Sequence, residues 1–285
     1  MLHEITNPEV VAALREHRED RDALLASLTQ SLYDDPHVRA AWLWGSFGRG
    51  EADDLSDLDP WLVVADDVVG EMGARLRQYA LLTGTFITGG EKPRNAPPGG
   101  GYFSSLHEGR HGLLHLDCYW EPQSTAQAVP DQAVLFDRLH EPLSISPQRP
   151  TAVQAPETQA PETLMTADAP TEQAERISGG IGFAWLMLSI AAKTLARHPD
   201  SDMGLMAYPR PGLEDAAGLL GLEGFITPSD WLVPEGPLDK VERLRSLAHK
   251  TARLTETANQ KGLNLSPLNA VCLSRYLDMV KGILK

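Results

Sequence analysis

Two aspartates separated by one residue, Asp57 and Asp59, are the side chains of this sequence best suited to chemistry. Alternate residues of a β-strand point to the same face, so these carboxylates share a face and Leu58 points away. Two strand residues span about 6–7 Å, which lets both carboxylates lean toward one or two divalent cations. Two such cations about 3.5–4 Å apart can stabilise the attacking and leaving oxygens of a phosphoryl displacement. Because magnesium prefers oxygen ligands, the pair predicts a magnesium site.

A glycine and a serine, Gly45 and Ser46, end an apolar segment shortly before the two aspartates. Glycine lets the backbone approach a ligand closely. Free amides and a short hydroxyl in the following turn can hold a phosphate. Arg49 adds a positive charge, and we also assign Ser56 to this nucleotide site. Each feature alone is common in turns and surface loops, so the prediction depends on their order and spacing together.

A third carboxylate, Asp117, lies in the alternating segment Leu113–Trp120. The alternation predicts a strand with one apolar face and one face that carries His115 and Asp117. We expect His115 to be a hydrogen-bonded structural histidine, and Glu121 is the alternative third acid.

The strand that ends in Gly-Ser, the spacer of ten residues after Ser46 and the Asp-apolar-Asp pair resemble the signature of the DNA polymerase β-like nucleotidyltransferase superfamily. The resemblance implies two magnesium ions, held by Asp57, Asp59 and Asp117, and ATP as the nucleotide donor. Members use the third acid either as a metal ligand or as the general base on the acceptor hydroxyl, and both roles stay open for Asp117. Pro60 departs from the pattern, which usually has an apolar residue there that continues the strand. Because proline suits strand edges or starts, the strand is expected to be edge-like at this point.

Periodicity and turn residues predict an N-terminal mixed sheet flanked by helices. We expect the helices at about 8–33 and 66–82, strands at 38–44, 57–64, 83–88, 102–106, 113–120 and 133–137, and a glycine- and proline-rich loop at 89–101.

The C-terminal part reads as a helical, bundle-like domain. A proline-rich stretch predicts a linker, which divides the chain into a catalytic domain 1–145, a linker 146–169 and a helical substrate-binding domain 170–285. We expect helices at 171–197, 238–258 and 268–283, with a kink or late start at Gly179, Gly180 and Gly182. This plan resembles aminoglycoside and lincosamide nucleotidyltransferases, several of which place a lysine on the triphosphate. Lys193 is the candidate for that role here, and the alternative is a surface lysine with a packed stem.

Composition narrows the choice of partners. The chain has 285 residues and a net charge of −14, with no run of basic residues, which disfavours nucleic acid as a partner. An acidic surface could attract a cationic small molecule or only keep the protein soluble. The N-terminus lacks signal-peptide features, and the apolar run 181–192 is too short to cross a bilayer, so we expect a cytoplasmic protein without a membrane partner.

The predicted activity is that of an adenylyltransferase, which moves AMP from ATP to a hydroxyl of a small, cationic molecule and releases pyrophosphate. An aminoglycoside-type antibiotic is one such acceptor, and antibiotic resistance is then one biological role. Two alternatives remain open: a transferase that modifies a protein or a tRNA, as in toxin–antitoxin members, and a nucleotide-binding module without turnover.

Overall fold

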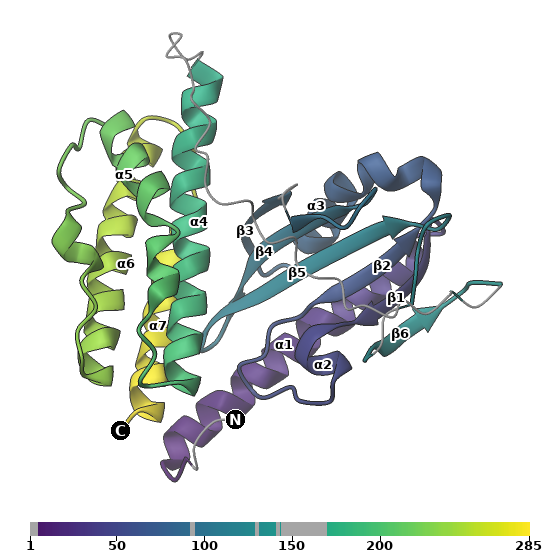
Figure 1. The fold of residues 1–285 in the computed structure, drawn as a ribbon, viewed down its shortest axis with the longest axis horizontal. Helices are drawn as coiled ribbons and strands as arrows, with labels where there is room; N and C mark the ends of the chain where they lie inside the picture. The colour runs from purple at the N-terminus through teal and green to yellow at the C-terminus, as the bar shows by residue number, and fades with distance from the viewer. Residues whose placement is uncertain (1–4, 92–94, 129–130, 141–142, 144–169) are drawn as a thin grey trace. The chain divides into compact units, whose positions relative to one another are not determined.

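The computed structural model describes residues 5–91, 95–128, 131–140, 143 and 170–285 (Figure 1). A six-stranded mixed sheet with helices comes first and a helical region follows, which confirms the predicted fold class. The predicted linker 146–169 lies outside the described residues.

The N-terminal part contains both strands and helices. Its helices are α1 (Pro8–Asp34), α2 (Gly45–Gly48) and α3 (Met72–Leu82), with the 3-10 turn η1 (Asp66–Glu71) before α3. Its strands are β1 (Val38–Leu43), β2 (Pro60–Val64), β3 (Phe86–Glu91), β4 (Gly101–Gly109), β5 (Gly112–Pro122) and β6 (Ala133–Asp137).

The strands form one sheet in the order β3-β4-β5-β2-β1-β6. Strand β2 pairs antiparallel with β1 and parallel with β5, so it lies inside the sheet, and all five of its residues are buried. A neighbouring strand therefore holds β2 on each side. This pairing also fixes the direction of the side chains that directly precede β2.

Helices α1 and α3 cover one face of this sheet. Leu62 and Val64 of β2 pack there with Leu28 of α1 and with Met72 and Leu76 of α3. Burial of each such side chain contributes roughly 1.5–3 kcal/mol. Because side chains alternate along β2, Trp61 and Val63 face the opposite side, where they belong to a second, smaller apolar cluster. We call that opposite side the carboxylate face.

The start of β2 differs from the prediction. The regular strand begins at Pro60, not at Asp57, and only a single bridge between Leu58 and Leu116 continues the pairing toward its N-terminus. Proline cannot donate to the ladder but is tolerated as the first residue of a strand. The amide of Trp44 donates to the Asp59 carbonyl (2.9 Å), which keeps the preceding segment beside β1. Pro60 thus begins an interior strand and is not at a sheet edge.

The third strand also differs from the prediction, since it runs from Phe86 to Glu91 and includes glycines predicted as loop. Thr83 belongs to the end of α3, where its hydroxyl donates to the Ala80 carbonyl (2.6 Å). Gly89 pairs with Ser105 of β4, and a Cβ at Gly89 would lie 2.6 Å from the Ser105 Cβ. Close contact between the strands therefore requires the glycine.

The helical region contains α4 (Pro170–Arg197), α5 (Arg210–Leu219), α6 (Pro237–Gln260) and α7 (Leu268–Ile283), with 3-10 turns η3 (Gly204–Ala207) and η4 (Pro228–Trp231). Helix α4 packs against α5, α6 and α7, around the buried Trp185. It is continuous through its glycines, where the kink was predicted. At Gly180 the glycine allows close packing, because a Cβ there would lie 2.3 Å from the Gly212 carbonyl oxygen of α5, whereas a Cβ at Gly179 or Gly182 would have no neighbour within 4 Å.

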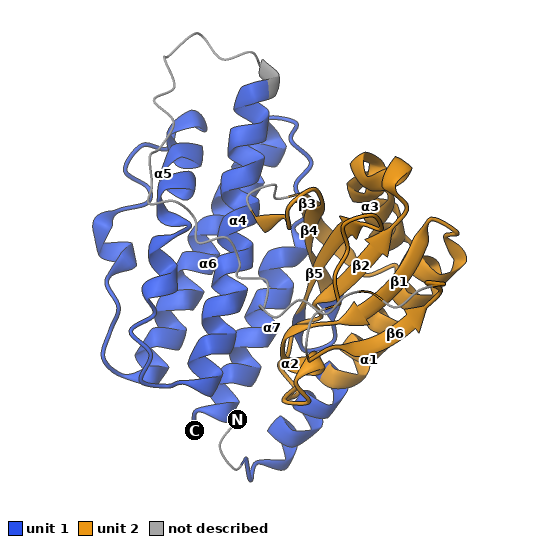
Figure 2. Cartoon of the chain, turned by 45° about the vertical axis from the view of Figure 1, so that its right-hand side comes forward, with its two compact units in different colours: residues 1–17, 108–113, 163–285 blue, residues 18–107, 114–162 orange. Residues whose placement is uncertain are grey.

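The chain forms two compact units (Figure 2). The sheet unit comprises residues 18–107 and 114–162, and the helical unit comprises 1–17, 108–113 and 163–285. The first turns of α1 and the β4–β5 turn thus belong to the helical unit. In that unit, Val10 lies against Gly282 of α7, and the His111 imidazole lies 2.7 Å from the Glu16 carboxylate.

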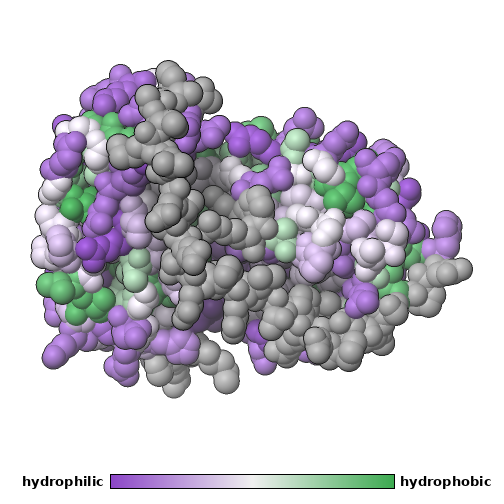
Figure 3. Space-filling model, turned by 45° about the horizontal axis from the view of Figure 1, so that its top comes forward, coloured by the Kyte–Doolittle hydropathy of each residue, from purple (hydrophilic) through white to green (hydrophobic). Residues whose placement is uncertain are grey.

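Among the described residues on the face in Figure 3, hydrophilic residues predominate and hydrophobic ones form small, separate groups. One helical stretch, Glu172–Arg197 in α4, is long and apolar enough to cross a membrane by length and composition. This stretch is longer than the run 181–192, but 56% of its apolar window is buried inside the structure, as in a core helix.

Candidate functional site

The parallel pairing of β2 with β5 brings the predicted acids together. Trp61 pairs with Tyr119 and Leu58 bridges to Leu116, so the same register sets Asp59 beside Asp117. Two backbone hydrogen bonds hold this register: the Leu58 amide donates to the His115 carbonyl (3.1 Å), and the Asp117 amide donates to the Leu58 carbonyl (2.8 Å). Leu58 and Leu116 point into the core under α1 and α3, and the acids therefore lie on the carboxylate face.

Gly45 fits tightly against the second aspartate. Its φ of +66° lies in the left-handed region that favours glycine, and a Cβ there would lie 2.5 Å from Asp59 Oδ2. We predicted that a ligand would approach this glycine, and in the structure the Asp59 carboxylate does so. Gly45 is the first residue of the short helix α2, so the half-buried Ser46 lies in the first turn of this helix.

The other residues assigned to the nucleotide make local contacts. Arg49 is exposed, and its Nε lies 2.7 Å from the Glu51 carboxylate. Ser56 is buried, and its hydroxyl donates to Asp53 Oδ1 (3.1 Å) and accepts from the Asp53 amide (2.9 Å). Lys193 lies half-buried on α4 of the helical unit.

A histidine links two of the acids. The buried His115 ring has Nε2 3.0 Å from Asp117 Oδ1 and Nδ1 3.5 Å from Asp57 Oδ2, the latter an ion-pair distance too long for a strong hydrogen bond. Ser104 Oγ lies 3.1 Å from the same Nε2. Burial alone would lower the pKa of His115, but the carboxylates of Asp117 and Asp57 raise it to about 10. The ring is therefore positively charged at neutral pH and offsets part of the negative charge of Asp57, Asp59 and Asp117, which we call the acid cluster.

A tyrosine also contacts the third acid. The Tyr102 hydroxyl donates to Asp117 Oδ1 (2.5 Å), and burial together with the Asp117 charge raises the pKa of this phenol. The sequence identified His115 only as a structural histidine and did not single out Tyr102. The available signal was the alternation of Tyr102 and Ser104 on the neighbouring strand, but pairing them with Asp117 and His115 requires the register.

Aromatic rings border the acids on the carboxylate face. Trp61 stacks on Tyr119 with ring centroids 5.2 Å apart, and Trp44 contacts both rings edge-on. The Trp61 indole donates to Glu121 Oε1 (2.9 Å), and burial raises the pKa of Glu121. Glu121, the alternative third acid, thus supports Trp61, while Asp117 lies in the cluster.

The donor set fits magnesium by type, since carboxylate oxygens from three side chains share one face. Asp57, Asp59 and Asp117 are the residues that would hold such an ion. Within the described part of the chain, no group of three or more His, Cys, Asp or Glu side chains is already arranged to hold a metal ion. His115 instead contacts Asp57 and Asp117.

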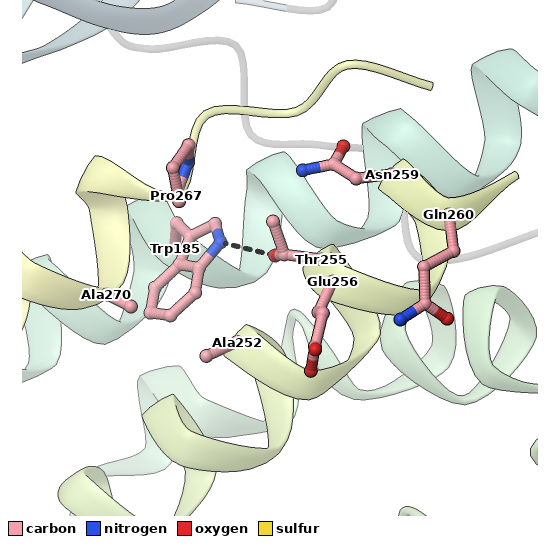
Figure 4. Close-up of a pocket in the computed structure, with 8 residues that line it drawn as sticks. All are labelled: Trp185, Ala252, Thr255, Glu256, Asn259, Gln260, Pro267 and Ala270. Carbon is pink, nitrogen blue, oxygen red and sulfur yellow. Dashed lines mark hydrogen bonds between the residues drawn. The ribbon is translucent and has the colours of Figure 1, made fainter. Parts of the chain in front are cut away.

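A separate cavity of about 420 Å³ lies in the helical unit, between α4, α6 and the start of α7 (Figure 4). Three of its polar side chains have partners within the unit: the Trp185 indole donates to Thr255 Oγ1 (3.3 Å), and the Asn259 amide binds both backbone groups of Leu265. None of the predicted site residues lines it. The lining residues are Trp185, Ala252, Thr255, Glu256, Asn259, Gln260, Pro267 and Ala270.

The fold and the site together define a mixed-sheet unit with an acid cluster opposite its helix-covered face, followed by a helical unit. Comparison with known protein families and with curated protein sequences gave no match.

Proposed function

We propose that this protein is a magnesium-dependent nucleotidyltransferase of the DNA polymerase β-like type. It transfers AMP from ATP to a hydroxyl of a small molecule and releases pyrophosphate. The observation that carries the proposal is the meeting of Asp57 and Asp59, just before β2, with Asp117 of the parallel strand β5, beside the turn at Gly45. Phosphoryl transfer needs such a cluster because its catalysis is mostly positioning and charge stabilisation.

Each residue has a definite role in this proposal. Asp57 and Asp59 hold the cations, which stabilise the charge on the phosphoryl oxygens when bound. Asp117 either completes the metal site or accepts the proton of the acceptor hydroxyl. Ser46 and the amides of its turn hold the β- and γ-phosphates, with Arg49 and Ser56 nearby in the sequence, and Lys193 stays a sequence-based candidate for a triphosphate ligand.

The acceptor is a cationic small molecule, of which aminoglycoside-type compounds are one class. The support is electrostatic: the chain carries a net charge of −14, which favours encounter with a cation. The same charge opposes a polynucleotide acceptor, which would need basic residues to neutralise its phosphates. This reaction would take place in the cytoplasm.

The test is an incubation of the full chain with α-labelled ATP and Mg²⁺ against aminoglycosides, lincosamides and simple sugars, with total protein and tRNA as further arms. We expect label on a small cationic acceptor. Asp57→Asn and Asp59→Asn should abolish transfer while the fold is kept, whereas Asp67→Asn, an exposed acid outside the cluster, should leave transfer unchanged. Transfer that persists in both cluster variants would refute the site, and label on protein or tRNA would refute the acceptor class.

A further inference from the structure

Two side chains outside the sequence signature contact Asp117, the third acid. Tyr102 of β4 donates its hydroxyl to Asp117 Oδ1 (2.5 Å), and His115 Nε2 of β5 lies 3.0 Å from the same oxygen. The second described partner of Nε2 is the Ser104 hydroxyl. Both described contacts of the carboxylate therefore fall on Oδ1.

Contacts on a single oxygen restrict how the carboxylate can turn. The terminal torsion of an aspartate is broad when nothing holds it. Two charge-assisted partners on Oδ1 select one orientation, in which Oδ2 is the oxygen presented to a ligand. His115 extends the restriction, because its other nitrogen lies 3.5 Å from Asp57 Oδ2. One ring thus spans two acids that belong to different segments of the chain.

We propose that Tyr102 and His115 are positioning residues, which hold Asp117 by Oδ1 so that Oδ2 faces a divalent cation and which set the separation of Asp117 from Asp57. The inference rests on the proposed function, since the cation is part of that proposal. Preorganised ligands bind a metal more tightly because fewer groups must be ordered on binding, and this is the expected benefit of the arrangement.

A second buried histidine in the same hairpin separates this role from ordinary burial. His107 is also buried, but its nitrogens contact hydroxyl groups, Thr85 Oγ1 (3.1 Å) and Ser105 Oγ (3.0 Å). Hydroxyl partners are sufficient to satisfy a buried imidazole. His115 already has one in Ser104, so hydrogen-bond satisfaction alone does not explain its contacts with two carboxylates.

The experiment measures binding of Mn²⁺ to the full chain without nucleotide, by the electron paramagnetic resonance signal of free Mn²⁺. Loss of partners that orient metal ligands typically weakens affinity about 10- to 100-fold. We expect that loss for Tyr102→Phe, and a smaller net loss for His115→Asn, because this variant also removes a positive charge that opposes binding of the cation. His107→Asn is the matched control and should bind Mn²⁺ as the unmodified protein does. In an Asp117→Asn background, Tyr102→Phe should have no further effect, which a merely structural tyrosine would not predict.

The outcomes separate this inference from the proposed function. If Tyr102→Phe binds Mn²⁺ normally while Asp59→Asn does not, the metal site stands and the positioning role is wrong. If the unmodified chain binds no Mn²⁺, both proposals fail. Urea unfolding of each variant identifies loss of fold, and should His115→Asn fail to fold, Tyr102→Phe decides because it removes only a hydroxyl.

Discussion

At the scale of single residues, one backbone position limits where the Asp59 carboxylate can lie. Gly45 adopts φ +66° and leaves no room for a Cβ beside Asp59 Oδ2. Gly50, five residues later, has nearly the same φ of +68° but nothing within 4 Å of the position of a Cβ. A comparison of these two positions therefore separates the effect of backbone strain from the effect of contact with Asp59.

We predict different effects for Gly45→Ala and Gly50→Ala. Alanine at positive φ costs about 1 kcal/mol of stability in both, because the left-handed conformation strains an L-residue. Only Gly45→Ala must also displace the Asp59 carboxylate, so it alone should weaken Mn²⁺ binding, by about tenfold or more. Urea unfolding and Mn²⁺ titration of the two variants check this. Equal Mn²⁺ affinity in both variants would contradict the role of Gly45.

Residue types and spacing predicted the acids but not their partners. Alternation around Leu58 predicted that Asp57 and Asp59 share a face, and alternation around Leu116 predicted the same for His115 and Asp117. Only the family resemblance implied that Asp117 lies beside the pair. The contact of Tyr102 with Asp117 depends on which residues of β4 and β5 face each other, and a shift by one residue would reverse it. Sequence periodicity does not contain that register.

At the scale of an element, strand β4 carries a buried histidine that links stability to pH. His107 is fully buried among Thr83, Thr85 and Ser105, and burial, together with the charge of His115, lowers its pKa from 6.5 to about 4. A histidine that is harder to protonate in the folded state lets the unfolded state bind the proton first. Stability from this group is therefore present above pH 6.5 and is lost as the pH falls from 6.5 toward 4.

We predict that His107→Gln flattens the acid limb of the stability curve. Below pH 6.5 the unfolded state of the unmodified protein gains a proton that the native state lacks, which costs up to about 1.4 kcal/mol per pH unit. Urea midpoints at pH 7, 6 and 5 should fall more steeply for the unmodified protein than for the variant, whatever the absolute stability of the variant. Parallel slopes would show that His107 is protonated equally in both states.

Glycines were the main source of error at this scale. Gly89 read as loop and lies in β3, and Gly180 read as a kink and lies inside a continuous α4. In each case a close neighbour, Ser105 or Gly212, leaves no room for a side chain at the glycine. A glycine that allows close packing looks the same in a sequence as one that breaks an element, so only the tertiary neighbour distinguishes them.

At the scale of the whole molecule, the order of a sheet followed by helices was predictable, but the membership of α1 was not. Leu24, Leu28 and Leu32 of this helix belong to the core of the sheet unit. Val10 packs on Gly282 in the helical unit. Val10 and the three leucines follow the same helical period. This period predicts which face of the helix is buried, but it does not predict which other element covers that face.

Metal binding should be linked to the stability of the sheet unit. A cation that binds only the native acids stabilises them by about 2.7 kcal/mol at a concentration of about 100 Kd. Mn²⁺ should therefore slow amide hydrogen exchange at Leu58 and Asp117, whose amides hold the register between the acids.

Residues of α6 in the helical unit serve as the internal reference, with Leu254 as a fully buried example. Exchange there by local opening should not change with Mn²⁺, because the cation contacts none of those groups. Asp59→Asn should remove the effect at Leu58 and Asp117, and chelation with EDTA should reverse it in the unmodified protein. A uniform slowing across both units, or slowing that persists in Asp59→Asn, would mean that the cation binds elsewhere, and the acid cluster would then lose its assignment as the metal site.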